Sequence, residues 1–204
     1  MTESYPFPID ENVLSVQFAC PEKRDSRAAY WRGVGLLISN FAKVETALKM
    51  LTAKMIRTDL STGKIITSGM TCSAILNLLR QLNNLPNNAD THEINIIITQ
   101  IEIIIKERHN IAHNGLTFID PVSAISHKNL IAKPSTKIIS TSYSIDDLHA
   151  MIDDCAYITI RLIALMEPTF LEKSTSTSCK ITDFKQSIYG PWRYQKQIKQ
   201  NNAH

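Results

Sequence analysis

The sequence predicts an all-α fold: a four-helix bundle with a short β insertion before its last helix and a polar, basic C-terminal tail. Apolar residues recur at steps of three and four along four separate segments, which is the period of a helix with one buried face. Only 6 glycines and 8 prolines occur in 204 residues, which argues against a barrel or sandwich with many tight turns. This length suits a single hydrophobic core.

Three regions are expected: an N-terminal extension over 1–26, a helical domain over 27–171 with a β-prone insertion at 116–143, and a basic tail over 172–204. The tail holds six lysines and arginines but two acidic residues, so the net charge of +3 lies mainly there. The helical body is therefore not a strongly basic nucleic-acid binder, and any electrostatic footprint is local or in the tail.

The first helix is expected from about Arg27 to Ile56, where an apolar stripe runs along about eight turns. Gly33 and Gly35 lower the helix propensity of its first turns, so the helix is expected to begin later or to kink there. The following stretch DLSTGKIITSG is expected to be a loop. A second helix is expected from about Met70 to Leu82.

The third helix is expected over Thr91–His113, where isoleucines form a broad apolar face. Asp90 followed by Glu93 fits a capping box at its start. Runs of β-branched residues also favour strands, but about 23 residues without a turn signal are far longer than ordinary strands. The pair Asn114-Gly115 is typical of a left-handed C-cap.

The insertion contains three short β-prone pieces between proline-containing turns, which predict a small ribbon or an ordered loop: Leu116–Ile119, Asn129–Ala132 and Lys137–Ser140. Ser144 then caps a fourth helix, which Pro168 ends.

Composition argues against metal sites and membrane segments. The cysteines are widely spaced, with no CxxC pair or cluster with histidine, which favours reduced thiols in a cytosolic protein: Cys20, Cys72, Cys155 and Cys179. The chain begins without a secretory signal pattern and has no uncharged apolar run near about 18 residues. We therefore expect a cytoplasmic protein with no membrane span, no metal and no other cofactor.

The segment Arg108-His109-Asn110-Ile111-Ala112-His113 brings one guanidinium and two imidazoles to the end of the third helix. His109 and His113 lie about 40° apart on one helix face. Arg108 and His113 are separated by about 140° around the helix and about 7.5 Å along it, so direct contact within one helix is not assured. Two copies facing each other across a two-fold axis would gather these groups around one cleft. A homodimer is thus part of the functional hypothesis.

The chemistry that such a cleft favours is RNA cleavage. A neutral imidazole can take the proton from a ribose 2′-hydroxyl, and an imidazolium can protonate the leaving 5′-oxygen. Arginine can hold the phosphate and stabilise its growing negative charge. No carboxylate cluster suited to magnesium accompanies the segment. A metal-independent mechanism is therefore the simpler hypothesis.

This segment resembles the signature of the HEPN (higher eukaryotes and prokaryotes nucleotide-binding) superfamily, in which an arginine, a polar residue, three variable positions and a histidine close a bundle helix. Arg108, His109 and His113 match the three signature positions, and Asn110 is an additional polar neighbour. The resemblance extends in outline over 27–167. It implies a metal-independent endoribonuclease that acts as a dimer on an RNA substrate, often in phage defence or in a toxin–antitoxin system with an antitoxin or regulatory protein as partner.

One position departs from a subgroup of that superfamily. Toxins paired with nucleotidyltransferase antitoxins have a tyrosine two residues after the histidine, where this chain has Gly115. The resemblance does not extend to that pairing. Elsewhere, Glu45 in the first helix either approaches the site and orients an imidazole or is a charge on an exposed face.

Two alternatives stay open. The superfamily includes non-catalytic members, so the chain is either a ribonuclease or a helical interaction or regulatory module in which the segment is a solvated helix end. The aromatic residues of the tail either stack on RNA bases or form an arm that packs on the body or on a partner: Phe184, Tyr189, Trp192 and Tyr194.

Overall fold

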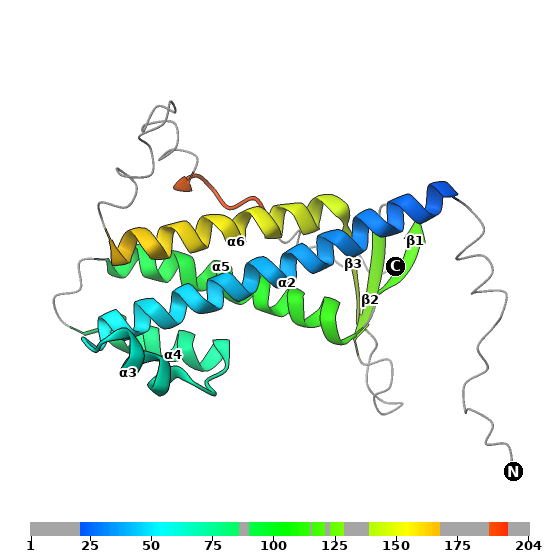
Figure 1. Ribbon diagram of the computed structural model, residues 1–204. Helices are drawn as coiled ribbons and strands as arrows, with labels where there is room; N and C mark the ends of the chain where they lie inside the picture. The colour runs from blue at the N-terminus through cyan, green and yellow to red at the C-terminus, as the bar shows by residue number, and fades with distance from the viewer. Residues whose placement is uncertain are drawn as a thin grey trace, which may run out of the picture.

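The computed structural model describes residues 21–85, 90–114, 116–120, 123–128, 139–167 and 188–195. They form a mostly helical domain with a small three-stranded sheet at one end (Figure 1). The expected helical character is confirmed. Predictions that fall outside these ranges include the first part of the N-terminal extension, the β-prone piece Asn129–Ala132, the conformation of Gly115 and the role of Phe184.

Two long helices, α2 (Pro21–Met55) and α6 (Ile145–Met166), run side by side in the same direction (Figure 1). Near their starts, a Cβ added at Gly33 would lie 3.2 Å from the Leu148 side chain, so the helices approach closely there. Near their ends, the Lys54 ammonium donates to the carbonyl of Leu165 at 3.2 Å, which satisfies a terminal acceptor of α6. Packing on α6 stabilises the turns of α2 that contain Gly33 and Gly35. Helix α2 begins at Pro21, earlier than the expected Arg27.

The stretch expected to be a loop contains a helix, α3 (Leu60–Thr67), so that prediction is wrong. Asp59 begins it, because its carboxylate accepts hydrogen bonds from the backbone N–H groups of Ser61 and Thr62 at 2.9 and 3.0 Å. A Cβ added at Gly63 would lie only 2.2 Å from the Ala53 Cβ. The absence of a side chain at Gly63 therefore permits close packing of α3 on α2.

The next two helices are α4 (Cys72–Asn83) and α5 (Thr91–His113), and α5 has the expected bounds. The expected capping box is wrong, because the Asp90 side chain makes no capping hydrogen bond. Glu93 instead forms a two-pronged ion pair with Arg161 of α6, at 2.5 and 2.9 Å.

The left-handed conformation expected at the end of α5 belongs to Gly115, the residue after Asn114, and stays a prediction. Asn114 has φ −98° and ψ 2°, outside the left-handed region, and its N–H donates to the carbonyl of Asn110 at 3.1 Å. Gly115 lies outside the described residues. The last turn of α5 is therefore closed by an ordinary helical hydrogen bond.

The insertion forms an antiparallel sheet in the order β1 (Thr117–Asp120), β2 (Ser123–Lys128) and β3 (Ile139–Ser144). The first and third expected pieces overlap β1 and β3. Strand β2 was not expected, because its polar sequence SAISHK lacks a clear apolar alternation; pairing with both neighbours stabilises it. Ser144 caps α6 in a capping box with Asp147, so the predicted start of that helix is confirmed.

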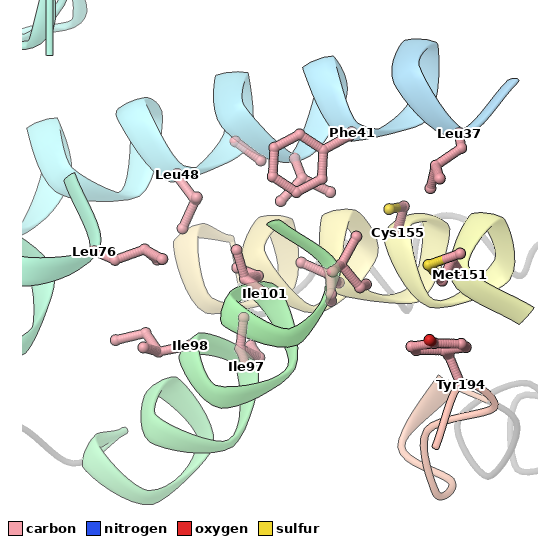
Figure 2. Close-up of a cluster of buried hydrophobic side chains, with 14 of the residues drawn as sticks. Leu37, Phe41, Leu48, Leu76, Ile97, Ile98, Ile101, Met151, Cys155 and Tyr194 are labelled. Atoms are coloured by element: carbon pink, nitrogen blue, oxygen red, sulfur yellow. The ribbon is translucent and has the colours of Figure 1, made fainter. Parts of the chain in front are cut away.

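The core lies where α2, α4, α5 and α6 meet (Figure 2). Each helix presents apolar side chains to it, and a buried tyrosine from near the C-terminus covers one side. Figure 2 labels residues from all of these elements: Leu37, Phe41, Leu48, Leu76, Ile97, Ile98, Ile101, Met151, Cys155 and Tyr194.

Residues 188–195, hereafter the C-terminal segment, are anchored to the body through Asp154 of α6. This buried carboxylate accepts hydrogen bonds from the backbone N–H groups of Arg193 and Tyr194, both at 2.9 Å, and from Nε2 of Gln100 at 2.8 Å. The Arg161 guanidinium lies 4.4 Å from the Trp192 ring centroid. For these residues, packing on the body is confirmed.

We predict that Ile101→Ala lowers the free energy of unfolding by roughly 2–5 kcal/mol, because Ile101 is fully buried and its truncation leaves a cavity. The matched control is Ile65→Ala, since Ile65 is 74% exposed and its loss is expected to change stability by less than about 0.5 kcal/mol. Urea unfolding followed by circular dichroism measures both. Equal effects of the two substitutions would contradict the described core.

We also predict a pH-dependent difference in stability between the wild type and Asp154→Asn. Burial raises the pKa of Asp154 above its ordinary value of 3.8, against the lowering effect of its hydrogen bonds. The folded protein thus holds this proton to higher pH than the unfolded chain. The unfolding free energy of the wild type minus that of the variant is expected to fall as pH rises from 3.8 through the folded pKa. Urea titrations at a series of pH values test this, and a rising difference would contradict it.

Candidate functional site

The two histidines of the predicted motif lie side by side at the end of α5. Both His109 and His113 are exposed, and their ring centroids are 4.5 Å apart with the ring planes tilted by 42°. Their spacing of four residues places them one turn apart on the same face. The negative end of the helix dipole lies at this terminus and favours a cation beside the rings.

Arg108 points in a different direction. Its guanidinium carbon lies 5.2 Å from the ring centroid of Phe41 on α2, and its buried Nε has no hydrogen-bond partner. Within the part of the chain that the structure describes, no hydrogen bond or ring contact joins this guanidinium to His109 or His113. The helix geometry that separates Arg108 from His113 by about 140° therefore holds in the folded chain.

Asn110 faces the interior. Its side-chain Nδ2 donates to the Tyr143 hydroxyl at 3.4 Å, and its backbone carbonyl accepts from the Ser126 hydroxyl at 2.9 Å. The Tyr143 hydroxyl in turn donates to the buried carboxylate of Glu107 at 2.6 Å. Asn110, expected as a polar neighbour of the site, thus connects the end of α5 to β2 and β3.

The buried hydroxyls of Tyr143 and Tyr30 keep their protons and act as hydrogen-bond donors. Burial, together with the hydrogen bond to Glu107, raises the pKa of Tyr143 well above its ordinary value. Burial and the negative charge of Asp147 raise the pKa of Tyr30 to about 12, and its hydroxyl donates to the carbonyl of Tyr143 at 3.4 Å. Sequence reasoning missed this cluster. The available signal was Glu107 itself, a charged residue in line with the apolar stripe of α5.

Glu45 lies on the Arg108 side of the helix end. Burial raises the pKa of the Cys72 thiol to about 12; the charge of Glu45 adds to this shift, while Arg108 and Lys49 oppose it. The charges of Glu45, Arg108 and Lys49 therefore all act on the Cys72 thiol, where α2, α4 and α5 meet. The described structure has no hydrogen bond or ion pair between Glu45 and an imidazole. Its predicted role in orienting one is not seen within a single chain.

The candidate site is an exposed helix face. Neither of two hollows in the surface is lined by Arg108, His109 or His113. One, of about 650 Å³, lies near the start of α5 and the ends of α2 and α4. The other, of about 600 Å³, lies between α2 and α6. Among the residues that the structure describes, no group of three or more His, Cys, Asp or Glu side chains is placed to hold a metal ion.

Comparison with known protein families, with curated proteins and with solved structures found no match to this chain. None of the described helices is both long enough and apolar enough to cross a membrane.

We predict that Asn110→Ala lowers the free energy of unfolding by about 1–3 kcal/mol, because it removes a buried donor to Tyr143. Asn77→Ala is the matched control: Asn77 is exposed on α4, and its loss is expected to cost less than about 0.5 kcal/mol. Thermal unfolding of both variants measures the difference. An unchanged Asn110→Ala protein would show that this contact contributes nothing to stability.

Proposed function

We propose that this chain is a metal-independent endoribonuclease of HEPN type that acts as a homodimer in the cytoplasm. The observation that carries the proposal is the pair of exposed imidazoles, His109 and His113, 4.5 Å apart at the end of α5. Two adjacent imidazoles can serve one reaction as base and acid, which is what cleavage of an RNA backbone requires.

The proposed reaction proceeds by internal transfer. One imidazole in its neutral form removes the proton of the ribose 2′-hydroxyl, and the resulting oxygen attacks the adjacent phosphorus. The bond from phosphorus to the 5′-oxygen breaks, and the second imidazole, as imidazolium, protonates that oxygen. The products are a 2′,3′-cyclic phosphate and a 5′-hydroxyl. Exposure of both rings leaves room for an extended RNA strand.

Arg108 supplies the positive charge for the phosphate in this proposal. Its guanidinium is partly buried against Phe41 and forms no hydrogen bond within the described residues, so its terminal N–H donors remain for an incoming anion. Because it faces away from the imidazoles of its own helix, we propose that it serves the His109–His113 pair of a second copy. A two-fold axis near the α5 ends would provide that arrangement.

The fold is compatible with the superfamily resemblance. We assign α2, α4, α5 and α6 to the four helices of a HEPN-like bundle, with α3 and the three strands as additions. The resemblance also suggests a biological setting, phage defence or a toxin–antitoxin system, with an antitoxin or regulatory protein as partner.

Cleavage of RNA by the untagged full-length protein in excess EDTA tests the activity. Arg108→Ala and His113→Ala are each expected to lower the rate by about 100-fold or more, because each removes a group that acts in the transition state. His92→Ala is the matched control, an exposed histidine at the other end of the same helix, and should retain the wild-type rate. Absence of wild-type cleavage, or equal rates in all variants, would refute the proposal.

Mixing two inactive variants tests the shared site. Suppose that each site takes its arginine from one copy and its histidine from the other. In a dimer of one Arg108→Ala chain and one His113→Ala chain, one site then lacks both groups and the other site keeps both. Random pairing is then expected to restore about a quarter of the wild-type activity. A mixture that stays inactive would place both groups of each site on one chain.

A second candidate function is a non-catalytic interaction module. The observation that favours it is the packing of Arg108 against its own chain, over Phe41. In that case the wild type cleaves no RNA, and the Arg108→Ala and His113→Ala variants keep the binding of any protein partner.

A further inference from the structure

The exposed face at the end of α5 has the features of a small chelating site. His109 and His113 are four residues apart on a helix, and neither imidazole forms a hydrogen bond or ion pair within the described part of the chain. Their ring nitrogens are therefore available as ligands. Paired histidines at this helical spacing can hold one metal ion between them.

The dimensions agree with such a site. An ion bound tetrahedrally at about 2.0–2.1 Å from each nitrogen separates the two nitrogens by about 3.3 Å. Rings whose centroids are 4.5 Å apart reach that separation through small side-chain rotations. Because both side chains are exposed, these rotations displace no packed neighbour.

The local charge is suited to a cation. α5 ends at His113, so the negative end of the helix dipole lies beside the pair. Arg108 is turned toward Phe41 on α2 and does not contact the rings. Lys106, exposed one turn earlier, is the cation on α5 that opposes binding.

We propose that His109 and His113 bind a first-row transition-metal ion such as Zn²⁺ or Cu²⁺, with water completing the coordination. Imidazole nitrogen is a preferred ligand of these ions, with Cu²⁺ held more tightly than Zn²⁺. Mg²⁺ prefers oxygen ligands and is not expected to bind.

Bound metal has a consequence for catalysis, and this consequence rests on the proposed ribonuclease function. An ion occupies the nitrogen lone pairs through which the imidazoles would accept and deliver protons. Zn²⁺ is therefore expected to inhibit RNA cleavage, and EDTA to restore it. The pair would act as an acid–base site when free of metal and as an inhibited site when loaded.

Calorimetric titration of the untagged full-length protein with ZnCl₂, CuCl₂ and MgCl₂ at mildly alkaline pH tests the binding. His109→Ala and His113→Ala are each expected to weaken Zn²⁺ binding by about tenfold or more, because each removes one of two protein ligands. His92→Ala should bind as the wild type does. Both variants place alanine on an exposed helix face, and circular dichroism checks that they fold.

The outcomes separate the two proposals. The metal site is overturned if His109→Ala and His113→Ala do not weaken Zn²⁺ binding, or if His92→Ala weakens it equally. Zn²⁺ binding that depends on the pair supports the site even when no RNA is cleaved, in which case only the ribonuclease proposal fails. Cleavage that continues at the wild-type rate when the pair is saturated with Zn²⁺ overturns the inhibition.

Discussion

Burial of the isoleucine face of α5 is the constraint on which the rest of the structure depends. A helix with one wide apolar face has one favourable rotation about its axis, because any other rotation exposes that face to water. With the isoleucines directed into the core, Glu107 and Asn110 also face inward, Arg108 faces α2, and His109 and His113 face solvent. The candidate site is thus a consequence of core packing, since the same rotation that fills the core exposes the imidazoles.

Buried polar groups fix the elements around this helix. Glu107 accepts a hydrogen bond from Tyr143, which ties the sheet to the end of α5. At mid-helix, Gln100 donates to Asp154, the carboxylate that also holds the C-terminal segment. Burying such groups is costly unless they are hydrogen-bonded, so each cluster specifies one arrangement of its elements. A shift of the sheet or of the C-terminal segment would leave a buried carboxylate with fewer donors.

The functional proposals depend on the different directions of three side chains. Because His109 and His113 lie together and Arg108 lies elsewhere, one chain presents the two imidazoles and the guanidinium on separate faces. A second copy can bring them to one substrate, which makes dimerisation a requirement of the ribonuclease hypothesis. Both proposals rely on the exposure of the imidazoles, and in them an RNA substrate and a metal ion would compete for the same nitrogen atoms.

The sequence by itself determined the helical class, the bounds of α5 and the helical spacing of the two histidines, because these depend on local periodicity. It also determined where α6 begins, because the capping box of Ser144 is local. Only the tertiary structure decided that α3 is a helix, that SAISHK is a strand and that Asn110 and Asp154 are buried anchors. Their stability comes from contacts with distant segments, such as Gly63 against Ala53, and no local pattern specifies such contacts. The direction of Arg108 was likewise decided by its packing on Phe41 of another helix.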